Sequence, residues 1–267
     1  MHGHGVSDAL AGSVPDALVP LLRVLTALGD PGVFLVAAPL LYWLGPRYDV
    51  IPAERAARVL GIVVGGLALV VALKSLFALH RPPATVSLVH ADGYGFPSGH
   101  TTGATVFYGT LAALLEIGRR RTRYVAAAAV VAVVAFTRLA LGVHYLPDVI
   151  AGVVAGSLYV AFALAVSRNR VANAFAVALG VGTAALVLAW TAEGATVFGA
   201  TVGGIVGWQF ARDHTDAVAD AAPWTVLALA PLLAVGGLPL AIEPSVPVAA
   251  AAGIVLGFGV VWVPTRL

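Results

Sequence analysis

Residues 119–141 read RRRTRYVAAAAVVAVVAFTRLAL, and this stretch alone indicates a helix that crosses a membrane. Four of its first five residues are arginine, and an apolar run from residue 124 follows them. A helix of roughly 17–25 residues spans the hydrocarbon core of a bilayer, and clustered arginines mark its cytoplasmic end. The stretch therefore predicts a membrane span at 124–141 with a basic anchor before it.

The composition extends this prediction to the whole chain. Of the 267 residues, 60% are hydrophobic and 10% are charged, whereas soluble domains carry about 25% charged residues. A soluble protein and a disordered chain are both excluded by these values. The apolar residues come in long runs instead of alternating segments, which is not typical of a membrane β-barrel. We predict an all-α, polytopic transmembrane helical bundle.

Short polar or Gly/Pro breaks separate the apolar runs, and an amphipathic stretch at 16–28 precedes them. We expect that stretch to form an interfacial helix. The run at 31–45 is short, so it either draws on the preceding segment or is tilted. The prediction is therefore eight or nine spans, near 31–45, 59–79, 101–117, 124–141, 147–166, 172–190, 195–211, 224–242 and 247–263.

The few charges divide between the two sides of the predicted bundle. Eleven arginines fall in loops on one side, which the positive-inside rule makes cytoplasmic. The other side receives Arg23, Lys74, Arg81 and Arg138. The net charge of +2, without a basic stripe, argues against a nucleic acid partner. The chain contains no cysteine, so disulfides and thiolate chemistry are excluded.

Three outward-facing segments, 74–82, 97–100 and 137–148, hold most of the reactive side chains. A lysine at the bilayer centre costs about 2.5–3.5 kcal/mol, which makes Lys74, the only lysine, a functional candidate. Arg81 and Arg138 lie at span ends on the same side. Together these cations favour an anion, and a phosphate suits both guanidinium and ammonium groups.

The remaining polar residues fit phosphoryl transfer. Ser98 and Gly99 precede a span, so their backbone N–H groups lie at a helix N-terminus, which favours phosphate. Asp148 can accept a hydrogen bond from one nitrogen of His144, which leaves the other as a nucleophile. His144 would form a phosphohistidine, and His100 would protonate the leaving oxygen and then activate water.

The pattern K-x6-R-P, P-S-G-H and T-R-x5-H-x3-D resembles the type 2 phosphatidic acid phosphatase (PAP2, lipid phosphate phosphatase) family, with Thr137 where that family usually has serine. The resemblance implies a bundle of about six helices, an extracytoplasmic site, and no metal or other cofactor. We divide the chain into an N-terminal tail and interfacial helix (1–30), a PAP2-like membrane core (31–170) and additional transmembrane helices (171–267).

The resemblance implies an integral cell-membrane phosphatase acting on an isoprenoid diphosphate, phosphatidate or phosphatidylglycerophosphate. The same residues would serve a lipid phosphotransferase, and a non-catalytic transporter or scaffold on this fold is a further alternative, as is a vanadate-binding haloperoxidase. A metal site at His90, Asp92, His100, His144 and Asp148 is another. The segment 83–96 is either a flap over the site or a passive loop. The oligomeric state is not predicted.

Overall fold

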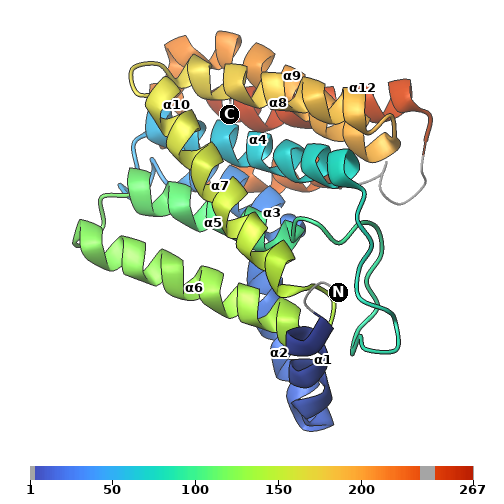
Figure 1. The fold of residues 1–267 in the computed structure, drawn as a ribbon. Helices are drawn as coiled ribbons and strands as arrows, with labels where there is room; N and C mark the ends of the chain where they lie inside the picture. The colour runs from blue at the N-terminus through green and yellow to red at the C-terminus, as the bar shows by residue number, and fades with distance from the viewer. Residues whose placement is uncertain (1–3, 235–243, 267) are drawn as a thin grey trace.

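The computed structural model describes residues 4–234 and 244–266, and these fold entirely as helices joined by loops (Figure 1). The prediction of an all-α bundle is confirmed. The longer helices are α1 (His4–Ser13), α2 (Val19–Thr26), α3 (Pro31–Leu44), α4 (Ala53–Phe77), α5 (Gly99–Leu114), α6 (Arg120–Ala140), α7 (Leu146–Val166), α8 (Val171–Leu188), α9 (Ala192–Ala211), α10 (Thr215–Asp220) and α12 (Val246–Trp262). Short 3-10 turns are η1 (Asp16–Leu18), η2 (Ala27–Gly29), η3 (Arg212–His214), η4 (Pro223–Ala228) and η5 (Val263–Thr265).

Local sequence sets several of the helix boundaries. The Oδ1 atom of Asp30 accepts a hydrogen bond of 2.7 Å from the backbone of Gly32, and Pro31 begins α3. An aspartate at the N-cap position and a proline at the first helical position are common signals for the start of a helix. Helix α4 ends at Phe77, because the next residue, Ala78, adopts the left-handed conformation (φ 48°). These boundaries fix where the site residues leave their helices.

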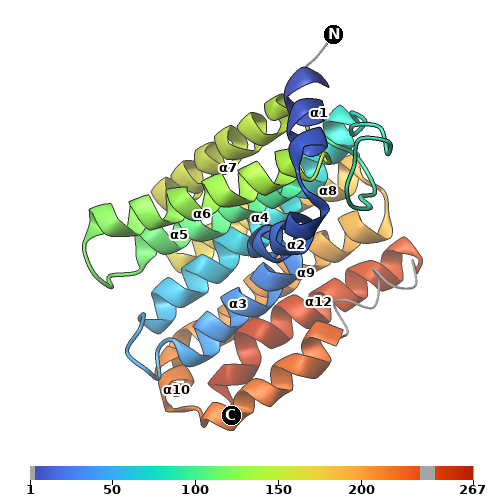
Figure 2. The ribbon, with the colours of Figure 1, turned by 90° about the horizontal axis from the view of Figure 1, so that it is seen from below.

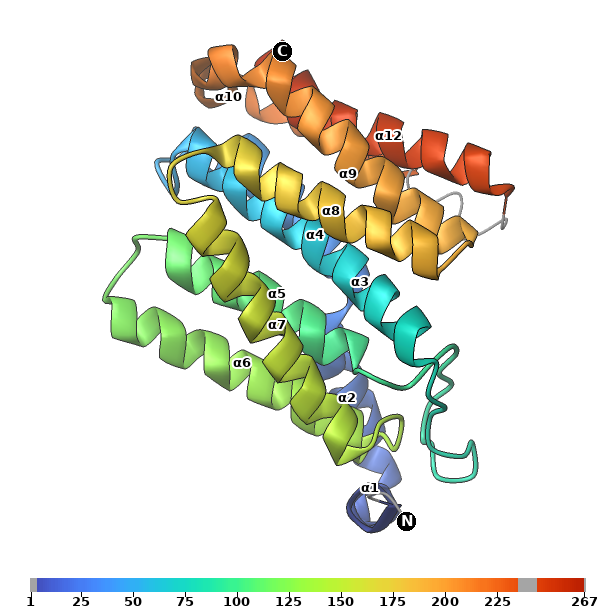
Figure 3. The same cartoon turned by 45° about the horizontal axis from the view of Figure 1, so that its top comes forward.

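The helices pack in successive layers (Figure 3), with some neighbours antiparallel, such as α5 and α6, and others parallel, such as α5 with α7, α4 with α8 and α9 with α12. Helix α5 contacts α4, α6 and α7, while α8 lies between α4 and α9, and α9 packs along α12. Gly152 permits the close approach of α7 to α5, because a methyl group there would lie 3.0 Å from the Ser98 carbonyl oxygen. This contact brings the first turns of α5 and α7 together. The view in Figure 2 shows α3 and α12 side by side with the ends of α9 and α10 nearby.

The outer helices present apolar side chains to their surroundings. On α7, the large side chains of Ile150, Val154, Leu158 and Phe162 are exposed. Only 28% of the most apolar stretch of α7 is buried inside the protein, against 67% of the corresponding stretch of α4. A surface of this kind is suited to lipid and not to water. This is a multi-pass membrane protein.

The expectation of eight or nine spans is wrong by helix length and hydropathy. Within the described residues, five helices are long and apolar enough to cross a membrane: α4, α6, α7, α8 and the stretch Val246–Thr265. Asp16–Gly29 and Pro31–Leu44, which meet at a 48° bend, make a sixth if they are counted as one span. The first short run thus draws on the preceding segment.

The missing spans have physical explanations. Helix α5 has 16 residues and is mostly buried, so it lies within the bundle as a short inner helix. Helix α9 carries buried glycine and threonine along its length, which lowers its hydropathy. The span expected at 224–242 lies partly outside the described residues. Its described part belongs to a short apolar helix, Pro223–Ala234.

The two ends of the bundle differ in charge. An ion pair of 2.5 Å joins Arg55 to Glu116, which ties the start of α4 to the end of α5. Arg47 donates to the carbonyl oxygen of Ala221 (3.2 Å) at the same end. The long loop after α4 lies at the opposite end (Figure 1). The alternation of helices thus separates the basic loops from the segments that carry the predicted site.

Candidate active site

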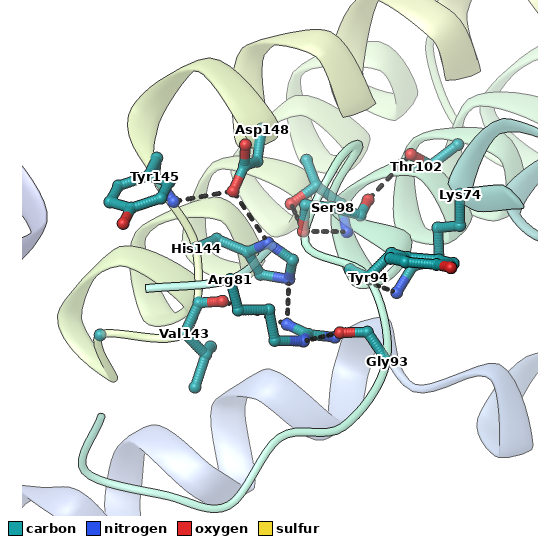
Figure 4. Close-up of polar contacts among 12 residues, drawn as sticks. Lys74, Arg81, Gly93, Tyr94, Ser98, Thr102, Val143, His144, Tyr145 and Asp148 are labelled. Carbon is teal, nitrogen blue, oxygen red and sulfur yellow. Dashed lines mark hydrogen bonds and ion pairs between the residues drawn. The ribbon is translucent and has the colours of Figure 1, made fainter. Parts of the chain in front are cut away.

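The predicted site residues come from helix ends that meet at one end of the bundle. Lys74 lies in the last turn of α4 and Arg138 in the last turn of α6. The first turns of α5 and α7 supply the rest, together with the loops before them. The residues are Lys74, Arg81, Ser98, Gly99, His100, Arg138, His144 and Asp148. Figure 4 shows the contacts around His144 and Lys74.

His144 is held between a carboxylate and a guanidinium. Its Nδ1 atom lies 3.3 Å from Oδ2 of Asp148, and its Nε2 atom lies 3.0 Å from Nη1 of Arg81. Since arginine only donates, Nε2 of the imidazole accepts, and the ring proton is assigned to Nδ1. The Asp148 oxygen also accepts from the backbone N–H of Tyr145 at 2.8 Å. The nitrogen that would attack phosphorus therefore carries the lone pair.

The Arg81 side chain is fixed by backbone oxygens as well as by His144. Nη1 donates to the carbonyl of Val143 at 3.1 Å. Nε donates to the carbonyls of Asp92 (3.0 Å) and Gly93 (3.2 Å). With Arg81 at the Nε2 edge of its ring, His144 is only 1% exposed. A substrate phosphate has to replace some of these contacts to reach Nε2.

The loop between α4 and α5 covers both cations. Besides its contacts with Arg81, it supplies the carbonyl of Tyr94, which accepts from Nζ of Lys74 at 2.9 Å (Figure 4). Backbone oxygens thus stand where phosphate oxygens would bind. The same loop is tied back by Leu88, whose N–H donates to the carbonyl of Leu141 at 3.0 Å. These contacts favour the flap interpretation of 83–96 over the passive loop.

Electrostatics keep the His144 ring neutral. Burial lowers its pKa well below the usual value, and the positive charges of Arg81, Arg138 and Lys74 lower it further, against a hydrogen bond with the Gly95 backbone that raises it. Burial also lowers the pKa of Arg81, against the opposing charges of Asp148 and Asp92. A neutral imidazole is the form that can act as a nucleophile.

Ser98 and Gly99 differ in what they can offer a phosphate. Ser98 is completely buried, its N–H donates to the Asp148 carbonyl at 3.0 Å, and its hydroxyl accepts from that of Thr101 at 3.0 Å. Both groups are therefore engaged within the protein, with Ser98 as the cap of α5. The first backbone N–H group of α5 itself belongs to Gly99. The phosphate-binding role of Ser98 stays a prediction.

Arg138 is buried with part of its hydrogen-bonding capacity unused. Its Nη1 atom donates to Oγ1 of Thr26 at 3.0 Å. Within the described part of the chain its Nε atom is buried and has no hydrogen-bond partner. An unpaired N–H on a buried cation is costly and is satisfied by an anion oxygen. Thr26 was not among the residues that the sequence indicated.

Asp30 is a second residue that sequence reasoning missed. Its Oδ2 atom lies 4.0 Å from Nε2 of His100, while Oδ1 caps α3. His100 also lies close enough to Arg138 and Lys74 for their positive charges to act on its ring. The dipeptide Asp30-Pro31 was a visible helix-start signal on the outward side. The residue pair is therefore a candidate arrangement for proton transfer.

The alternative metal set is not brought together. Among the described residues, no group of three His, Asp or Glu side chains could hold a metal ion. His90 and Asp92 form an exposed ion pair of 2.8 Å on the loop. The residues present therefore do not form the metal site weighed from the sequence.

The chain is similar to known membrane phosphatases. Residues 55–172 match the family model described as PAP2 superfamily. A solved structure, the transmembrane PAP2-type phosphatidylglycerolphosphate phosphatase from Bacillus subtilis, matches with a TM-score of 0.54 and 24% sequence identity. The match covers 63% of this chain and 87% of that one. No curated protein matches significantly.

Proposed function

We propose that this chain, of which residues 55–172 match the PAP2 superfamily model, hydrolyses a lipid phosphate or diphosphate through a phosphohistidine at His144. The observation that carries the proposal is the line of contacts from Asp148 through His144 to Arg81. It combines a nucleophile with a defined tautomer and a cation at the attacking nitrogen. Phosphatidate, phosphatidylglycerophosphate and isoprenoid diphosphates all carry the group that this arrangement would attack.

The first step forms the bond between Nε2 of His144 and phosphorus. The bond from phosphorus to the ester or diphosphate oxygen breaks, and His100 gives its proton to that leaving oxygen. Asp148 stabilises the positive charge that develops on the imidazole ring. Lys74, Arg81 and Arg138 bind the equatorial oxygens, which carry the transition-state charge.

The second step regenerates the free enzyme. A water molecule attacks phosphorus and gives a proton to His100, the bond to Nε2 breaks, and inorganic phosphate leaves. The Asp30 carboxylate near His100 is suited to stabilise the protonated form of that ring between the two steps. The same intermediate would pass to an alcohol in a phosphotransferase, so product analysis distinguishes the two activities.

The proposed location is the cell membrane, with the site on the extracytoplasmic side. The basic loops lie at the end opposite the site, and Arg55 and Arg47 are engaged there. By the positive-inside rule that end is cytoplasmic. The partners proposed are therefore a lipid phosphate of the outer leaflet and the bilayer itself.

The test is phosphate release by the protein purified in detergent with EDTA. A panel of lipid phosphates and diphosphates is assayed with the wild type, His144→Ala and, as a control, Arg23→Lys on the exposed face of α2. We expect release by the wild type and the control, and none by His144→Ala. Equal release by His144→Ala would contradict the nucleophile assignment, and no release by the wild type from any substrate would contradict the proposed function.

A further inference from the structure

An apolar cavity begins beside the phosphate-binding residues and runs into the bundle. It lies between α3 and α4 on one side and α9 and α12 on the other, and its volume is about 150 Å³. Helices α9 and α12 lie outside residues 55–172. Figure 3 shows these two helices as the layer above α4 and α8. The cavity is therefore built partly by the additional C-terminal helices.

The lining follows one face of each helix. On α4 it recurs at helical spacing along residues Leu60, Val63, Val64, Leu67, Val70 and Val71. On α9, Val197 and Ala200 face the same space. Glu193 is the single charged residue among the described residues that line it, and it is exposed at the start of α9. A stripe of this kind offers nothing to a polar ligand.

Gly99 joins the cavity to the proposed phosphate site. It is the first residue of α5 and also lines the cavity. A methyl group on Gly99 would lie 3.0 Å from Cγ1 of Val70 and 3.9 Å from Nζ of Lys74. The absence of a side chain thus lets Lys74 of the proposed phosphate site and Val70 of the apolar lining both pack against Gly99. A molecule with a phosphate at Lys74 would have its next atoms at the cavity mouth.

Two hydrogen bonds join α3 to α12 beside the lining residues Val260 and Val261. Nε1 of Trp43 donates to the carbonyl of Val260 (2.8 Å), and the hydroxyl of Tyr42 donates to that of Val261 (3.2 Å). These bonds clamp α3 against α12. Along α4 the lining extends over about 16 Å at 1.5 Å per residue. That depth is half of the roughly 30 Å hydrocarbon core, or one leaflet.

We propose that this cavity binds one hydrocarbon chain of the lipid substrate, and that the length of its lining limits the chain to about the depth of one leaflet. The proposal rests on the proposed phosphatase function and narrows its substrate class. A chain of ordinary acyl length fits, whereas a polyisoprenoid several times longer than a leaflet does not. Since lipid tails are as apolar in the bilayer as in the cavity, the cavity orients the substrate more than it attracts it.

The test uses monoalkyl phosphates whose chains run from much shorter to much longer than the cavity, with a polyprenyl phosphate added. Wild-type kcat/KM is expected to rise with chain length and then fall, and to be low for the polyprenyl substrate. Val197→Trp narrows the cavity, so it should lower kcat/KM about tenfold for the long chains and leave the short chains unchanged. Val206→Trp, on an exposed part of the same helix, is the matched control.

A second variant and a second readout distinguish a loss of chain binding from misfolding of the variant. Leu67→Phe narrows the cavity from α4 and should repeat the chain-length effect. A non-hydrolysable alkylphosphonate with a photoreactive group at its chain end should label peptides around Val260. Equal losses for short and long chains, or labelling confined to the outer face of α7, would overturn the proposal. Wild-type inactivity on every substrate would instead indicate failure of the proposed function.

Discussion

Nη1 of Arg81 lies 3.0 Å from Nε2 of His144, on the side of the ring opposite Asp148. The guanidinium thus lies on the side of Nε2 where a phosphate would bind during attack. It is directed at the place where the negative charge of the phosphate would develop. It defines the tautomer of the imidazole and covers it in the absence of substrate.

Replacing Arg81 with lysine tests its role toward the phosphate. Lysine keeps the charge but cannot contact Nε2 and the carbonyls of Val143 and Asp92 with a planar fork. We expect kcat/KM for a lipid phosphate to fall by about 100-fold, as for other lost transition-state donors. Steady-state phosphate release measures this, with Arg23→Lys as the control. A change of less than twofold in Arg81→Lys would show that the guanidinium is not required.

Asp148→Asn tests the second contact of the ring. An amide can present its NH2 group to Nδ1 and favour the wrong tautomer, with the lone pair on Nδ1. We expect kcat to fall by about 10³- to 10⁴-fold with little change in KM. Asp16→Asn, on an exposed turn, is the control. A normal kcat in Asp148→Asn would mean that the carboxylate does not orient His144.

The buried neutral state of His144 predicts a pH dependence of stability. Folding lowers its pKa, whereas the unfolded chain takes up the proton at an ordinary pKa of about 6.5. Below that pH the unfolded state binds more protons, so stability falls as pH falls. Thermal unfolding in detergent from about pH 8 to about pH 5 should give a steeper decline for the wild type than for His144→Gln. Parallel declines would contradict the assignment.

Asp30→Asn tests whether α3 contributes to proton transfer. The carboxylate lies 4.0 Å from His100, which would protonate the leaving oxygen. Supporting groups of this kind are worth about 10- to 100-fold. We expect that loss for an alkyl phosphate, whose leaving group needs a proton, and a smaller loss for the formation of phosphoenzyme from p-nitrophenyl phosphate. Equal losses on both substrates would indicate a structural effect instead.

Much of the site could be predicted from spacing in the sequence. Lys74, Arg81 and His144 stand in three short segments separated by helices, and alternation of helices brings those segments to one end. Asp30 and Thr26 could not be found in this way. Thr26 reaches Arg138, and Asp30 reaches His100, only because the chain bends between α2 and α3. These are tertiary relationships.

Hydropathy predicted the fold class but not the number of spans. It records whether a segment is apolar, not whether the segment faces lipid or lies inside the bundle. The inner helix α5 carries buried Thr101, Thr102 and Thr105, which hydrogen bond within the protein. The sequence did not indicate the cavity beside Gly99 either, since it arises where faces of six separate helices meet.

The most direct test of the account is to find the phosphoryl group on residue 144. In His100→Gln, p-nitrophenyl phosphate should still phosphorylate the enzyme, because its leaving group needs no proton, while hydrolysis of the intermediate is slowed. Alkaline quenching followed by peptide mass spectrometry should then locate an acid-labile phosphate on His144, absent from the double variant His100→Gln/His144→Gln. Phosphate on another residue, or no phosphoenzyme while turnover continues, would contradict the central claim.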